Sequence, residues 1–237
     1  MSVTRETPRS ANRLLAALSV QDFARASAQI ESAPMVQGAM IYQVRRQARY
    51  VWFPHEGLIS VVARDQEGKQ VEVGSIGCEG MTGAAIALGG GAMVNEAMVQ
   101  IRGQGSRMSA EAFRGLLDDS AAFKAIMLRY VLASYSQFSQ NSACYLIHRV
   151  AARCARWLLT AHDRVEGDTF PLTQDYLATM LGVTRPTVSA VAAKMQRDGL
   201  IRNSHGRITV LDRSRLEDAA CECYRIIEDE FERLAVD

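Results

Sequence analysis

The sequence lacks any long apolar run, has no cysteine pair at the CxxC spacing and carries a formal net charge of only +1. A transmembrane helix needs about 20 consecutive apolar residues, so no membrane span is expected. The N-terminal stretch MSVTRETPRSANR has no apolar core of the signal-peptide kind, and we expect a cytoplasmic protein with no membrane partner. Because the total charge is nearly balanced, any nucleic-acid binding must depend on a local basic patch.

Cysteine is sparse and irregularly spaced. The five cysteines are Cys78, Cys144, Cys154, Cys221 and Cys223. On a helix, Cys221 and Cys223 would point to different sides, which suits neither a disulfide nor tetrahedral zinc. The four histidines are scattered as well. We therefore expect no metal site and no iron–sulfur cluster. The chain also shows no P-loop and no nucleophile–base spacing, so catalytic residues and enzyme activity are not predicted.

The chain does contain a pattern typical of a helix-turn-helix, within residues 171–211. Thr173 suits an N-cap, and Leu177, Met180 and Leu181 follow at helical spacing. Gly182 then suits a corner that needs a positive φ. Thr184 is a second predicted N-cap, and it is followed by a helix whose Val188, Val191 and Met195 share one face. The length of 237 residues suits two modest domains, of which this would be one.

A hairpin is predicted directly after these helices. The apolar pair Leu200-Ile201 and the run Ile208–Leu211 flank the turn sequence Asn203–Gly206. Seven basic residues lie between positions 185 and 215, opposed only by Asp198 and Asp212. Helices, hairpin and charge together predict a winged helix-turn-helix that binds double-stranded DNA. The predicted DNA contacts are Thr173, Thr184, Arg185, Thr187, Ser189, Lys194, Arg202 and Arg207.

The first half of the chain is predicted to be a β domain behind one or two short helices in residues 13–32. Short runs rich in aliphatic and aromatic residues predict strands at 39–44, 50–53, 58–63, 69–73 and 94–101. The last strand is expected to end at Arg102-Gly103-Gln104-Gly105. Short antiparallel strands at this spacing suggest a small barrel or roll, which commonly holds a ligand.

The middle of the chain predicts a short helix from Ser109 to Leu117 and then a long helix from position 119 or 120. No charged residue occurs between Tyr130 and Ile147, so this helix should be covered on more than one side. We expect one face to contact the β domain. A second face is expected to meet the same helix of another copy: Phe123, Met127, Tyr130, Ser134, Phe138, Asn141 and Tyr145. A two-fold dimer suits a pseudo-palindromic DNA site.

This order of elements resembles the Crp/Fnr family of bacterial transcription regulators. The resemblance is carried by LTQDYLATMLGVTRPTVSAVAAKMQRDGLI, by RCARWLL (153–159) and by VEVGSIGCEGM (71–81). It implies an α+β fold with a cyclic-nucleotide-binding-like β-roll sensor at 1–118, a dimerisation helix at 119–146 and a winged helix-turn-helix at 147–237. It also implies a homodimeric, sequence-specific regulator of transcription, with RNA polymerase as a further partner.

The sensor departs from the pattern of members that bind cyclic AMP. Those members have a Gly-Glu pair followed about ten residues later by Arg-Ser. In this chain the sequence around Glu79 resembles the start of that cassette, but Asn95-Glu96 stands where the arginine is expected. A cyclic phosphate needs a compensating cation or N–H donors, so cyclic AMP is not the expected effector, and the effector stays unknown. Candidate effector residues are Gly77, Glu79, Gly80, Asn95 and Phe138.

One alternative remains open at this stage. Some winged helices bind protein rather than DNA, and the near-neutral total charge permits that function. Binding that does not respond to salt would favour a protein partner, because phosphate contacts make DNA binding weaken as salt rises.

Overall fold

The structure, a computed structural model, describes residues 10–236. The N-terminal part is a two-sheet β-roll, introduced by helices α1 (Arg13–Ala16) and α2 (Val20–Ser27). Its strands are β1 (Glu31–Met35), β2 (Met40–Tyr42), β3 (Tyr50–Pro54), β4 (Leu58–Arg64), β5 (Gln70–Ile76), β6 (Glu96–Ile101) and β7 (Gly103–Ser109), with helix α3 (Ala84–Ala87) between β5 and β6. All pairs are antiparallel, in the orders β1-β7-β3 and β2-β6-β4-β5. The predicted roll is therefore present.

Two strands of the roll, β1 and β7, were not predicted. Strand β6 ends at Ile101 as expected, and the glycine-containing stretch after it begins β7, the central strand of the other sheet, between β1 and β3. A Cβ on Gly103 would lie 2.0 Å from the carbonyl oxygen of Glu56, so this glycine permits close approach of two backbone segments. Glycine had suggested a turn, whereas here it serves packing within a strand.

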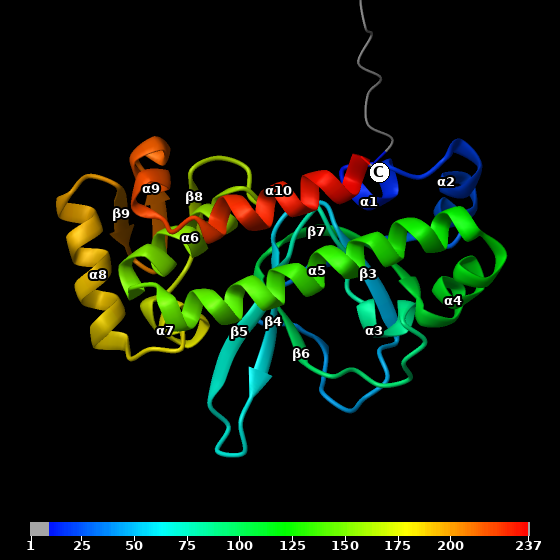
Figure 1. Ribbon diagram of the computed structural model, residues 1–237, viewed down its shortest axis with the longest axis horizontal. Coiled ribbons are helices and arrows are strands. Elements are labelled where there is room, and N and C mark those ends of the chain that lie inside the picture. The colour runs from blue at the N-terminus through cyan, green and yellow to red at the C-terminus, as the bar shows by residue number, and fades with distance from the viewer. Residues whose placement is uncertain (1–9, 237) are drawn as a thin grey trace, which may run out of the picture.

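Helix α4 (Ala110–Asp119) leads into the long helix α5 (Ala121–Ile147), which crosses the molecule in Figure 1. Ser109 and Ser120 cap the two helices by accepting hydrogen bonds from the N–H groups of Ala112 and Phe123. The face of α5 predicted to contact another copy is instead largely buried within this chain: Phe123, Met127, Tyr130, Ser134 and Asn141 are each at most 6% exposed. That expectation was wrong, because the apolar residues of this face cover the roll.

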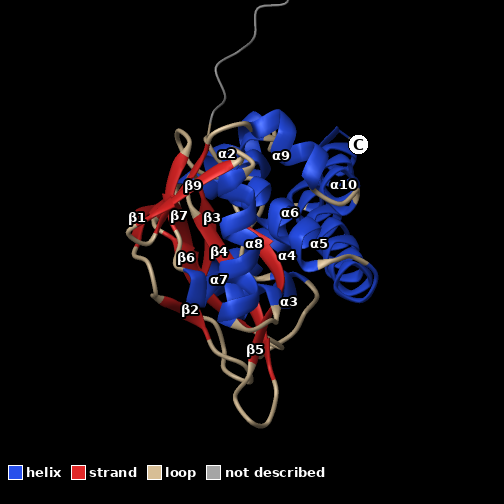
Figure 2. Cartoon of the chain, turned by 90° about the vertical axis from the view of Figure 1, so that its left-hand side faces the viewer, coloured by secondary structure: helices blue, strands red, loops and turns tan. Residues whose placement is uncertain are grey.

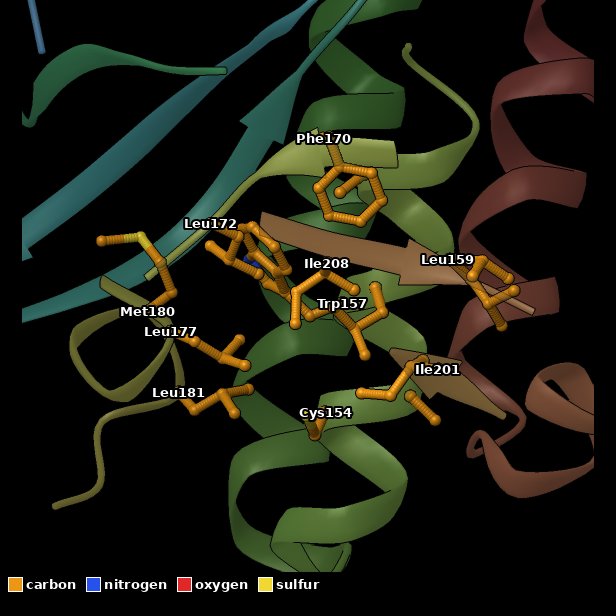
Figure 3. Close-up of a cluster of buried hydrophobic side chains, with 14 of the residues drawn as sticks. Cys154, Trp157, Leu159, Phe170, Leu172, Leu177, Met180, Leu181, Ile201 and Ile208 are labelled. Carbon is orange, nitrogen blue, oxygen red and sulfur yellow. The ribbon is translucent and has the colours of Figure 1, made fainter. Parts of the chain in front are cut away.

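The C-terminal part contains α6 (Val150–His162), β8 (Thr169–Pro171), α7 (Gln174–Leu181), α8 (Arg185–Arg197), β9 (Ile201–Ser204), β10 (Arg207–Val210) and α9 (Arg213–Ala219). Strands β8, β10 and β9 form one antiparallel sheet. Figure 3 shows how Trp157 of α6, Phe170 and Leu172 near β8, and Ile208 of β10 meet in one apolar core. This core extends into the roll through Leu58 of β4, so the two parts of the chain pack directly on each other.

The last helix, α10 (Cys223–Val236), lies beside α5, as Figures 1 and 2 both show, and it runs back toward α1 (Figure 1). Its Ile227 and Phe231 enter the apolar core of the roll, where the Phe231 ring stacks on Tyr130 with 6.1 Å between ring centroids. The structure shows that the apolar face of α10 links the C-terminal part to the N-terminal part. Within residues 10–236, no helix is both long and apolar enough to cross a bilayer.

Candidate nucleic-acid interface

The two helices of the predicted helix-turn-helix meet at a sharp corner. Thr173 Oγ1 accepts a hydrogen bond from the Tyr176 N–H at 3.3 Å, which begins α7 as predicted. Gly182 ends α7 with a φ of 64°, a conformation that side chains resist. Thr184 occupies the N-cap position of α8, but its hydroxyl meets the Thr187 hydroxyl at 2.9 Å and caps no N–H group. Thr184 is therefore the N-cap residue of α8, as predicted, but its side chain makes no capping hydrogen bond.

Helix α8 buries one face and presents the other to solvent. Val188, Ala192 and Met195 pack into the core, whereas Arg185 and Lys194 point outward with side chains 65% and 67% exposed. In Figure 1 the helix lies at one end of the molecule, far from α2 and α4 at the other end. An exposed helix at the extremity of a domain has the placement that a recognition helix needs to enter a major groove.

The predicted contact residues of α8 are not equally free. Arg185 lies 3.5 Å from Asp175, but both side chains are exposed, so the pair contributes little and can open. Thr187 is exposed. The Ser189 hydroxyl, by contrast, is engaged with Gln174 and with the carbonyl oxygen of Arg185. Asp175 and Gln174 had no predicted role, and only the folded corner brings them beside α8.

The hairpin β9–β10 forms the wing. Its turn uses His205 and Gly206, both with positive φ (49° and 71°), as a tight hairpin turn requires. Arg202 and Arg207 lie on the two strands and are exposed. The structure thus presents Thr173, Thr184, Arg185, Thr187, Lys194, Arg202 and Arg207 to solvent, with Ser189 half-buried. Their assignment as DNA contacts stays a prediction.

A buried ion pair ties this domain to the roll. Arg164, between α6 and β8, donates to Glu79 Oε1 from Nη2 at 2.8 Å and from Nε at 3.2 Å. Glu228 of α10 lies 3.7 Å away, and the Gly57 N–H donates to the Arg164 carbonyl oxygen. Burial alone would lower the pKa of Arg164, but the two carboxylates outweigh burial and hold it above its usual value. The pKa of Glu79 is lowered, since Arg164 outweighs the effect of burial.

A second buried carboxylate lies at the same boundary. Glu72 of β5 accepts hydrogen bonds from the Ser60 hydroxyl and, at 2.9 Å, from Nε1 of Trp157 in α6. Burial raises the pKa of Glu72 to about 7, despite these donors and the nearby guanidinium of Arg156. Nothing in the sequence pairs residues 85 positions apart, so neither Glu72–Trp157 nor Glu79–Arg164 was predicted.

The five candidate effector residues separate into two groups. Asn95 and Phe138 line a pocket inside the roll, together with Tyr42, Met93 and Gln137. The other three, Gly77, Glu79 and Gly80, lie outside this pocket: a Cβ on Gly77 would collide with Arg164, and one on Gly80 would collide with Tyr130.

The internal pocket has a volume of about 60 Å³. Small-molecule sites usually enclose about 300 Å³ or more, so side chains fill most of this space in the arrangement seen here. A more open cleft of about 630 Å³ lies between the β4–β5 hairpin and the end of α7, lined by Arg64, Lys69, Tyr145, Arg153 and Gly182 among others.

Three of the five cysteines come together. The Sγ atoms of Cys144, Cys221 and Cys223 all lie within 4.8 Å of one another. The expectation that Cys221 and Cys223 point apart was wrong, because Cys221 precedes α10 and only Cys223 is helical. Three gathered thiols do not by themselves identify a metal.

Comparison with known proteins shows which families and structures this chain resembles. Residues 152–219 match the Crp-like helix-turn-helix domain. No curated protein sequence matches the chain. Among solved structures, FixK2 from Bradyrhizobium japonicum is 15% identical with a TM-score of 0.68, over 81% of this chain and 98% of its own.

Two further solved structures have the same fold. The CRP-family regulator TTHB099 from Thermus thermophilus is 22% identical with a TM-score of 0.65, over 79% of this chain and 96% of its own. The c-di-GMP-responsive regulator CLP from Xanthomonas campestris is 14% identical with a TM-score of 0.64, over 82% and 100%. The sequence resemblance and the predicted fold class are confirmed, and these neighbours are regulators rather than enzymes.

Proposed function

We propose that this chain, which carries a Crp-like helix-turn-helix domain on the fold of the Crp/Fnr transcription regulators, is a homodimeric regulator that binds a pseudo-palindromic DNA site. The observation that carries the proposal is the exposed face of α8 at the end of the molecule, with Arg185 and Lys194 projecting from it. Arg185 suits a guanine edge, since its guanidinium can donate two hydrogen bonds. As a DNA-binding protein it would act in the cytoplasm, with RNA polymerase as a further partner.

The experiment is fluorescence anisotropy with duplexes selected from a random pool by the protein itself. Arg185→Ala is expected to weaken binding to the selected site by about 1–3 kcal/mol and to relax base preference. Lys194→Ala is the matched variant from the same helix, and it should weaken selected and scrambled duplexes equally and reduce the salt slope by about 1. Absence of any salt-dependent duplex binding by the unmodified protein would refute the proposal and favour a protein partner.

The dimer is inferred from the solvent-facing side of α5. A stripe of eight residues alternates spacings of four and three: Ala121, Ala125, Leu128, Leu132, Tyr135, Ser139, Ser142 and Leu146. None is charged, and Leu132, Tyr135 and Leu146 are 53%, 69% and 89% exposed. This is the heptad spacing by which two helices pack as a coiled coil. We therefore assign dimerisation to the side opposite the one suggested by sequence.

Light scattering on the purified protein tests the stripe. Leu132→Asp and Tyr135→Asp each place a charge in the middle of the proposed seam and are expected to give monomers. Ala122→Asp is the control, since residue 122 is exposed on α5 but lies outside the stripe. If the stripe variants remain dimers, the second copy binds elsewhere.

We propose a binding pocket for the effector but no chemical identity for it. We infer that the β-roll senses a small molecule through the pocket that Asn95 and Phe138 line, because this pocket lies between the strands and α5. Gly77, Glu79 and Gly80 would then act on effector binding indirectly, through Arg164 and Tyr130. Native mass spectrometry of the purified dimer would identify any retained ligand, and Phe138→Ala should change its occupancy. Retention unaltered by that change would move the site elsewhere.

A further inference from the structure

The three gathered cysteines come from two segments that are far apart in sequence. Cys144 lies in the last turn of α5, and Cys221 and Cys223 lie where α9 gives way to α10. All three are buried, at 0%, 6% and 1% exposed. The Sγ atoms of Cys144 and Cys221 are 3.5 Å apart, and the third lies within 4.8 Å of both.

These distances suit a metal ion. Zinc binds thiolate sulfur at about 2.3 Å in a tetrahedral arrangement, which places two sulfur ligands about 3.8 Å apart. The three sulfur atoms therefore form a triangle close to one face of such a site. His148 meets Glu222 at 3.3 Å beside the cluster but is not among the groups within 4.8 Å of all three sulfurs. Residues 10–236 thus offer three ligands to such an ion and leave its fourth position to water or solute.

Polar groups around the three cysteines could neutralise and orient a bound metal site. Three thiolates on a divalent ion carry a net charge of −1, which a buried site must neutralise. Arg156 is 5% exposed, interacts with Cys144, and has an Nε atom without a hydrogen-bond partner among the described residues. Gln140 Nε2 donates to Cys223 Sγ at 3.1 Å, as an orienting group around a metal ligand does.

We propose that Cys144, Cys221 and Cys223 form a binding site for a thiophilic divalent metal ion of the zinc class. Binding replaces the three thiol protons, which are released to solvent, and forms three sulfur–metal bonds with no change of oxidation state. The bound ion joins the end of α5 to the start of α10. The end of α5 directly precedes the joint at His148 and Arg149 that leads into α6. Metal occupancy therefore fixes the helix-turn-helix domain against the long helix.

The test uses the full chain, reduced and freed of metal, titrated with Co²⁺ and then with Zn²⁺. We expect one Co²⁺ per chain with a thiolate-to-cobalt charge-transfer absorption, displaced by Zn²⁺. Cys144→Ser, Cys221→Ser and Cys223→Ser should each abolish this absorption, whereas Cys78→Ser and Cys154→Ser should retain it. Gln140→Leu leaves all thiols in place and should weaken affinity by about 10–100-fold.

Three outcomes would overturn the site: no binding by the reduced wild-type protein, binding that survives the loss of any of the three cysteines, or rapid pairing of Cys144 and Cys221 as a disulfide that precludes metal. A melting measurement on each variant verifies that it is folded. If a Ser variant does not fold, Gln140→Leu still tests the site.

The regulatory consequence rests on the proposed DNA-binding function and is measured separately. Zn²⁺ should change the affinity of the wild-type protein for its selected duplex and leave that of Cys223→Ser unchanged. Metal binding without any change in DNA affinity would overturn the regulatory role alone, whereas failure of the cobalt titration would overturn the site whether or not the protein binds DNA.

Discussion

Replacing Arg164 by methionine leaves Glu79 buried without its cation. The Arg164 and Glu79 side chains are 2% and 6% exposed, so water cannot replace the lost interaction. Removal of one partner from a buried ion pair costs about 3–5 kcal/mol, because the remaining charge is uncompensated. Methionine keeps most of the apolar contact of the arginine side chain. We therefore expect Arg164→Met to lower the free energy of unfolding by about 3–5 kcal/mol.

Glu79→Gln should cost less. The glutamine keeps an acceptor oxygen for the Gly77 N–H and for Arg164, and Arg164 keeps Glu228 at 3.7 Å. We expect a loss of about 1–3 kcal/mol for this variant. The control is Arg225→Met, which removes an arginine that is 63% exposed from its pair with Glu217 and should change stability by less than about 1 kcal/mol.

The assay is urea unfolding at neutral pH, followed by tryptophan fluorescence, since Trp157 lies at the same domain boundary. An Arg164→Met loss no larger than that of Arg225→Met would refute the reasoning, because it would mean that Arg164 is solvated and the two domains are apart in solution. Equal losses for Arg164→Met and Glu79→Gln would refute the compensating role of Glu228.

Three further predictions concern the same contacts. The native pKa of Glu72 is about 7 against an ordinary 4.5, so the folded state binds this proton more tightly than the unfolded chain, and the stability contributed by this group falls by about 3 kcal/mol as the pH rises from 4.5 through 7. The free energy of unfolding of Glu72→Gln should decline less across that pH range. A decline equal to that of the unmodified protein would contradict the burial of Glu72. Gly182→Ala should lower the melting temperature at a cost of about 1–2 kcal/mol, since φ is 64° and the new Cβ would lie 3.3 Å from Val71 Cγ2; no shift would mean that the corner relaxes. Phe231→Ala should cost about 3 kcal/mol and raise hydrogen exchange along α10, because Phe231 is 8% exposed and stacks on Tyr130; unchanged exchange would mean that α10 does not depend on this contact.

Local patterns predicted most of the elements. The helix start at Ser109, the cap at Thr173, the corner at Gly182 and the turn before Arg207 depend on residues near in sequence, and each lies where expected. It was harder to predict which side of α5 faces the roll. Two apolar stripes run along this helix, and periodicity alone does not say which covers the roll and which faces solvent.

Long-range contacts lay beyond sequence reasoning. Glu79 resembled part of an effector cassette, yet its carboxylate is committed to Arg164, a residue in the other domain. The grouping of Cys144 with Cys221 depends on where α10 begins and on its return along α5. Such encounters are set by packing of whole elements, which composition and spacing do not encode for a single pair.

The return of α10 constrains how the two ends of the molecule can move. Two helices, α5 and α10, span the distance between the DNA-binding end and the roll side by side, and each is anchored in the apolar core near Tyr130. A rotation at the joint after Ile147 that left the connection between α9 and α10 unchanged would pull Phe231 away from Tyr130. Reorientation of the recognition helix therefore requires either sliding of α10 along α5 or bending of the short connection between α9 and α10, and the easier of the two sets the free-energy cost of switching.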